Sequence, residues 1–203
     1  MMPASCRREW AETAESAFDR LATGGKPVAV IGVFDGGDVG ATAGEAQARG
    51  AVGVDGAFLA IRFSGLIPLR PATYLRGLAE VRSNLPPRPS AVRDPVMRRW
   101  AAGSSMFRTF SLQATLSALE LIDEVTPMVP EVRVPALVIQ GQLDTAGEAF
   151  NAVWLHQRLG SLPKELLKMN KSGHLVALDR ERDQVIAATL NFLASRVLRE
   201  ASL

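Results

Sequence analysis

The sequence has little of what disulfide, metal or dinucleotide chemistry requires. Cys6 is its only cysteine, so no intramolecular disulfide bond can form. We find no cluster of metal-ligating residues, and the glycine-rich stretch from Gly32 to Gly37 does not follow the dinucleotide pattern G-x-G-x-x-G. We therefore expect neither a metal nor a cofactor in this protein.

Long apolar runs and a strong net charge are also missing. No stretch approaches the ~18 apolar residues that a membrane span needs, and residues 1–15 lack the apolar core of a secretory signal. The formal net charge of +2 is too small to indicate nucleic acid as the main partner. We expect a cytoplasmic protein with no membrane span and no nucleic-acid partner.

What the chain does contain is an alternation of strand and helix patterns. Strands are expected from Val28 to Val33 and over residues 53–61, 134–140 and 165–169. Helices are expected over residues 9–21, 38–49, 146–159 and 179–198. This alternation predicts an α/β fold with a mostly parallel sheet of about four strands and helices on its faces.

The middle of the chain interrupts this alternation. Six prolines between Pro68 and Pro95 break it into short pieces. One clear helix is expected there, over residues 109–124, and we see no strand pattern. We therefore predict that residues 1–61 and 131–203 form the two parts of an α/β core, and that residues 62–130 form a helical cap insertion.

The stretch Gly32-Val33-Phe34-Asp35-Gly36-Gly37 has the setting of a nucleophile elbow. An apolar strand leads into it and a helix of small residues follows, as in the G-x-S-x-G turn of serine hydrolases. The glycines at 32 and 36 permit a strained turn and a close approach to the helix. The serine position, however, is Phe34, whose ring cannot be acylated.

Two further polar residues follow expected strands, at the end of the sheet where α/β proteins place their ligands. Asp144 comes after the strand at 134–140, and His174 comes after the strand at 165–169. The chain order of elbow, Asp and His is that of the α/β-hydrolase triad. In such a triad the carboxylate fixes the imidazole tautomer, and the other ring nitrogen acts as the base.

These features resemble a known family over the stretch from Trp10 to about Leu193. The chain is similar to the small carboxylesterases and monoacylglycerol lipases of the α/β-hydrolase superfamily. The strongest stretches are Val134-Pro-Ala-Leu-Val-Ile-Gln-Gly141 with Asp144, and Ser172-Gly-His-Leu-Val-Ala-Leu-Asp179 followed by Glu181-Arg182-Asp183.

The resemblance implies a carboxylic-ester hydrolase of the serine-esterase type that acts on a small acyl ester. It implies that Asp144 and His174 are the retained acid and base, and that Phe34 stands at the position of the missing nucleophile. The backbone N–H of Asp35 would be one oxyanion donor. The insertion at residues 62–130 would cover an acyl pocket.

Two departures from the family predict impaired or absent activity. One is Phe34, and the other is that only 33 residues precede it. We therefore expect a truncated, partial α/β-hydrolase fold without the upstream oxyanion loop, in which Phe34→Ser alone does not restore full activity. The strand from Val28 to Val33 would then have an unpaired apolar edge, which predicts a homodimer or a complementing chain at that edge.

Two other functions stay open on the sequence. An active hydrolase would use Asp35 as its nucleophile, or a water activated by His174. The simpler role for Asp35 is to cap the following helix. A non-catalytic binding or partner protein would use the pocket or the open sheet edge.

Overall fold

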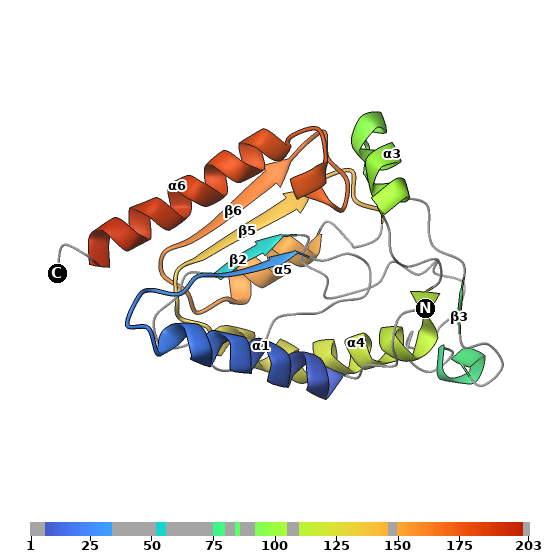
Figure 1. Cartoon of the computed structure of the whole chain (residues 1–203), viewed down its shortest axis with the longest axis horizontal. Coiled ribbons are helices and arrows are strands. Elements are labelled where there is room, and N and C mark those ends of the chain that lie inside the picture. The colour runs from blue at the N-terminus through green and yellow to red at the C-terminus, as the bar shows by residue number, and fades with distance from the viewer. Residues whose placement is uncertain are drawn as a thin grey trace.

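The computed structural model describes residues 7–33, 52–55, 75–79, 84–85, 92–104, 110–145 and 150–200. Within these residues, one parallel sheet has the strand order β1-β2-β5-β6 (Figure 1). Its strands are β1 (Val30–Val33), β2 (Val52–Asp55), β5 (Ala136–Gly141) and β6 (Lys164–Met169). The predicted α/β class with a parallel sheet is confirmed.

The central strand β5 shows where the core lies. Every residue of β5 is buried, as expected for a parallel strand that is covered on both faces. Successive side chains of a strand point to opposite faces. Ala136 and Val138 accordingly enter one hydrophobic cluster, whereas Leu137 and Ile139 enter another.

Helices cover both faces of this sheet. The first cluster contains side chains of α4 (Leu112–Val125), the 3₁₀ helix η1 (Thr126–Glu131) and α5 (Phe150–Arg158). The second cluster contains Val185 and Phe192 of α6 (Arg182–Glu200). Figure 1 shows α6 running along β6, with α4 on the other side of the sheet.

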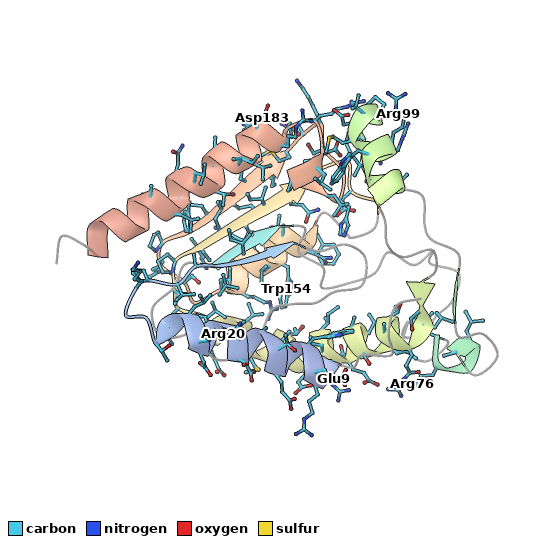
Figure 2. All side chains as sticks on the ribbon, in the orientation of Figure 1. Glu9, Arg20, Arg76, Arg99, Trp154 and Asp183 are labelled. Atoms are coloured by element: carbon cyan, nitrogen blue, oxygen red, sulfur yellow. The ribbon has the colours of Figure 1, made fainter. Side chains whose placement is uncertain are left out.

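The N-terminal helix α1 (Arg7–Ala22) lies alongside α4 (Figure 1). None of its residues is fully buried, and it is held partly by charge. The Arg7 guanidinium pairs with Glu120 at 2.6 Å and with Glu124 at 3.2 Å. In Figure 2, Glu9 and Arg76 mark this side of the molecule, and Arg99 and Asp183 mark the opposite side.

In the described part of the middle segment there are helices and a short antiparallel ladder. Residues 75–79 are helical, and α3 spans Pro95–Ser104. Two-residue strands, β3 (Asn84–Leu85) and β4 (Phe110–Ser111), pair with each other. This ladder is separate from the main sheet, and the sequence shows no strand pattern at these residues. A strand of two residues has no alternation to reveal it, because alternation takes several residues to recognise.

Two expected elements begin a few residues later in the structure than the sequence predicts. β5 begins at Ala136 and not at Val134, since Pro135 has no N–H to donate to a neighbouring strand. α6 begins at Arg182 and not at Asp179, and a short 3₁₀ helix, η2 (Val176–Leu178), precedes it. Residues 34–51 and 56–61, which include the expected elbow from Phe34 onward and the helix at 38–49, lie outside the described residues. Among the described helices, none is long and apolar enough to cross a membrane.

Candidate active site

The structure brings Asp144 and His174 together, although thirty residues separate them. β5 and β6 are adjacent and parallel, so their carboxyl ends reach the same edge of the sheet. The loops that follow these strands carry the two side chains. His174 Nδ1 lies 2.8 Å from Asp144 Oδ2, and both side chains are almost completely buried, with exposed fractions of 1% and 0%.

The two loops are held against each other by backbone contacts. Gln142 donates its N–H to the Met169 carbonyl at 2.8 Å, and Leu143 donates to the Ser172 carbonyl at 3.0 Å. Gly141 lies where the loops touch. A Cβ atom on Gly141 would collide with the Gly173 carbonyl oxygen and would lie 2.7 Å from that of Ser172. Glycine is thus required there by the close approach of the loops.

Gln140 is a third member of the buried polar group. Its side-chain Nε2 donates to Asp144 Oδ2 at 2.9 Å and to the Gly141 carbonyl at 3.2 Å. It is only 1% exposed. Asp144 Oδ2 therefore accepts from both His174 and Gln140, which orients the carboxylate and helps to compensate its burial.

The His174 loop is fixed by two more carboxylates. Glu181 Oε2 accepts from the Ser172 hydroxyl at 2.7 Å and from the Lys171 N–H at 2.8 Å. Asp179 Oδ2 accepts the N–H of Gly173, next to the histidine, at 2.7 Å. The roles of Gln140 and Asp179 in holding these loops are not predicted by the sequence. The available signal was their place in the two stretches that resemble esterases.

The start of α3 lies next to this loop, and its charges are arranged around Asp94. Asp94 Oδ1 accepts the N–H groups of Met97 at 3.0 Å and Val96 at 2.8 Å, and Arg182 lies 3.7 Å from Oδ2. The Met97 amide, with the Val96 amide and the guanidinium of Arg182, lowers the pKa of Asp94 below its usual value, although desolvation opposes this. Asp94 is therefore held in its charged form.

Other predicted site residues are not among those described. Phe34 and the Asp35 backbone lie outside them, so their placement relative to His174 stays a prediction. Within the described segments, no group of three or more His, Cys, Asp or Glu residues is arranged to hold a metal ion.

The chemistry available to this pair follows from its geometry. An ionised carboxylate can only accept a hydrogen bond, so the proton between Asp144 and a neutral His174 is carried by Nδ1. The lone pair of the imidazole then resides on Nε2. This is the tautomer that can take a proton from a nucleophile as a general base.

No protein-family profile matches the sequence, and no curated protein matches it. The structure, in contrast, is similar to many solved ones. A metagenome-derived lipolytic enzyme superimposes with a TM-score of 0.77 at 21% identity, over 95% of this chain and 75% of that one. The Paleococcus ferrophilus monoacylglycerol lipase gives 0.77 at 16% identity, over 95% and 76% of the two chains.

The enol-lactonase of Burkholderia xenovorans is a more distant neighbour, with a TM-score of 0.59 at 20% identity, over 94% of this chain and 74% of that one. These neighbours are α/β hydrolases. The chain therefore has the α/β-hydrolase fold, as the sequence predicted. At these identities the likeness establishes the fold, and the chemistry has to be argued from the residues.

Proposed function

We propose that this protein is a carboxylic-ester hydrolase of the α/β-hydrolase fold in which Asp144 and His174 keep the acid and base roles. The observation that carries the proposal is the buried 2.8 Å contact between His174 Nδ1 and Asp144 Oδ2 at the carboxyl ends of adjacent strands. Phe34 in place of a serine nucleophile impairs the ordinary acyl-enzyme route.

The acid and base can still support a slower reaction with water. Asp144 holds the Nδ1–H tautomer of His174, and Nε2 takes a proton from a water whose oxygen attacks the ester carbonyl carbon. The tetrahedral intermediate then expels the alkoxide, which takes the proton back from His174. The products are a carboxylic acid and an alcohol. Loss of a serine nucleophile lowers kcat by ~10⁶ in a well-studied protease, so this route is expected to be very slow.

Hydrolysis of p-nitrophenyl acetate tests the proposal. We expect slow turnover that is lost in His174→Ala and kept in His156→Ala, which changes the only other histidine. A fluorophosphonate probe should not label the wild-type chain. Turnover that survives His174→Ala, or labelling of the wild-type chain, would contradict the proposal.

Restoring the nucleophile gives a second test of the same acid and base. We expect Phe34→Ser to gain labelling by the fluorophosphonate, and Phe34→Ser with His174→Ala to lose it again. The matched control is Phe34→Ala, which shortens the side chain in the same way but adds no hydroxyl. It should stay unlabelled. Labelling of Phe34→Ser that does not depend on His174 would show that this histidine is not the base.

We also propose that the acyl pocket is covered by the part of residues 62–130 that precedes α4. The packing of α4 supports this boundary. Its residues Ala118, Leu121 and Ile122 share a hydrophobic cluster with Val138 of β5, so this half of the helix is part of the α/β core.

A partner function has one observation in its favour. β1 is the terminal strand of the sheet among the described strands, and its Ile31 is 55% exposed. We propose that this edge pairs with a second copy or with a complementing chain, because an exposed apolar edge is a template for strand addition.

A further inference from the structure

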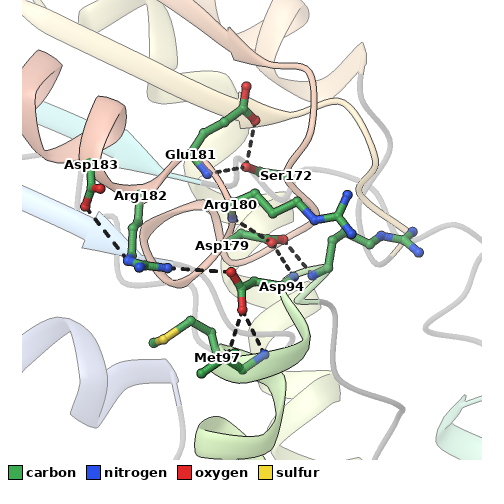
Figure 3. A network of polar contacts seen from close by, with 10 residues as sticks. Asp94, Met97, Ser172, Asp179, Arg180, Glu181, Arg182 and Asp183 are labelled. Carbon is green, nitrogen blue, oxygen red and sulfur yellow. Dashed lines mark hydrogen bonds and ion pairs between the residues drawn. The ribbon is translucent and has the colours of Figure 1, made fainter.

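The Asp179 carboxylate, near the site, is held by several backbone donors. Asp179 has an exposed fraction of 0%, and its side chain accepts four backbone N–H groups. Oδ2 accepts from Arg93 at 2.8 Å and Gly173 at 2.7 Å, and Oδ1 accepts from Asp94 at 2.7 Å and Arg180 at 2.8 Å. Figure 3 shows Asp179 between Arg180 and Asp94. Four charge-assisted bonds compensate the burial of this charge.

These donors come from segments that are far apart in the sequence. Gly173 precedes His174 directly, whereas Arg93 and Asp94 lead into α3. Asp179 thus joins the histidine loop to the start of α3. A second bond completes the connection on the other side, because the Arg93 guanidinium donates from Nη2 to the Leu143 carbonyl at 2.7 Å. Leu143 directly precedes Asp144.

Arg93 therefore holds the residues before both members of the acid–base pair. Its backbone N–H reaches the Asp179 carboxylate, which also holds Gly173, and its side chain reaches Leu143. We propose that Asp179 and Arg93 are positioning residues, and that the docking of the segment before α3 sets the geometry of Asp144 and His174. This inference rests on the proposed acid–base role of that pair.

The geometry explains why a carboxylate is needed at position 179. Both of its oxygens accept N–H groups, and an amide offers only one oxygen together with an NH₂ donor. In Asp179→Asn one side of the group would face two N–H donors without an acceptor. Depending on which way the amide turns, either the N–H groups of Arg93 and Gly173 or those of Asp94 and Arg180 would lose their acceptor. Either loss loosens the segment before α3.

Nuclear magnetic resonance of histidine side chains can test this without relying on turnover. The chain has two histidines, so a sample labelled with ¹⁵N-histidine gives signals from His174 and His156 only. The readout is the rate at which the His174 Nδ1 proton exchanges with water. His156, whose Nε2 lies 3.4 Å from the Lys164 carbonyl, serves as an internal reference.

We expect Asp179→Asn to raise this exchange rate about tenfold or more, as for the loss of a buried charge-assisted bond. Arg93→Ala removes an exposed side chain and should raise it about two- to fivefold. Arg93→Lys keeps a cationic donor and should recover most of the wild-type rate. Arg98→Ala on the exposed face of α3 is the matched control and should leave the rate unchanged.

The inference is overturned if Asp179→Asn and Arg93→Ala leave the His174 exchange rate unchanged while their melting temperatures fall. That result would mean that the bonds stabilise the fold without positioning the histidine. If Asp179→Asn does not fold, the comparison of Arg93→Ala with Arg93→Lys decides the question.

Ester hydrolysis, measured on the same variants, separates the two proposals. If the exchange rates change as expected but the protein shows no turnover, the positioning role is supported and the proposed function is contradicted. Turnover that depends on His174, together with unchanged exchange rates, would support the function and overturn the positioning role.

Discussion

At the residue scale, the central feature is a single carboxylate oxygen that accepts two buried donors. His174 Nδ1 and Gln140 Nε2 lie 2.8 and 2.9 Å from Asp144 Oδ2. A carboxylate oxygen has room for both, because it presents two lone pairs. Gln140 therefore holds the Asp144 carboxylate in place without displacing the histidine.

Substitution of Gln140 by methionine tests how much this donor contributes. We expect Gln140→Met to lower the free energy of unfolding by about 1.5–3 kcal/mol, because the charged Asp144 loses a buried hydrogen bond. Urea unfolding measures this change. Gln113→Met, on the exposed face of α4, is the control and should have little effect. Equal stability of Gln140→Met and the wild-type protein would show that the donor is unimportant.

A second residue-scale prediction concerns Asp94 and pH. Its pKa is lowered in the folded state, mainly by the Met97 amide. A lowered carboxyl pKa stabilises the protein above the unfolded value near 3.8, and this stabilisation is lost as the pH falls through the folded pKa.

Asp94→Asn keeps an N-cap side chain but removes the charge. We expect the variant to be less stable than the wild-type protein above about pH 4, and the difference to shrink toward lower pH. Thermal unfolding between pH 3 and 6 measures it. The exposed Asp183→Asn provides a control on α6, because its side chain is 93% exposed. A difference that stays constant across this pH range would contradict the prediction.

At the scale of elements, the junction between β5 and the loop after it depends on Gly141. The two loops that carry Asp144 and His174 approach so closely that no side chain fits between them. The same approach allows the backbone bonds from Gln142 and Leu143. Close contact of these loops thus brings Asp144 and His174 within hydrogen-bond distance.

We expect Gly141→Ala to destabilise the protein by about 1–3 kcal/mol or more, since the new methyl group collides with backbone carbonyls that have little room to move. Gly103→Ala in α3 is a matched control, because a Cβ there meets nothing within 4 Å. Alanine in a helix should be neutral or stabilising by about 0.5–1 kcal/mol. Urea unfolding compares the two variants. Similar stabilities of both would show that the loops can separate at little cost.

At the scale of the whole molecule, the main feature is the edge strand β1. This strand ends the sheet among the described strands, and Ile31 is more than half exposed. A lysine on an edge strand is a common means by which proteins prevent pairing of sheet edges.

We expect Ile31→Lys to weaken self-association by about tenfold or more, because two copies paired at this edge would place like charges close together. Light scattering with size-exclusion chromatography over a range of concentrations measures the change. Ile186→Lys on α6, where the isoleucine is 50% exposed, is the control. A wild-type protein that is monomeric at high concentration would contradict pairing between copies and leave the complementing chain to be tested by co-purification.

The local sequence indicates the class of the fold and the two candidate site residues. The apolar run of β5 and the helical spacing in α1, α4 and α6 arise from neighbours along the chain, so periodicity reveals them. Asp144 and His174 each follow a strand, and parallel strands bring such residues to one edge of the sheet.

The groups that hold the Asp144 and His174 loops, in contrast, are set by the tertiary structure. Asp179 bonds to Arg93 and Asp94, which lie 86 and 85 residues away, and Arg93 bonds to Leu143, fifty residues away. The ladder between β3 and β4 likewise depends on contact between distant segments. No periodicity along the chain specifies such partners, because hydrogen bonds between distant groups are fixed by packing in three dimensions.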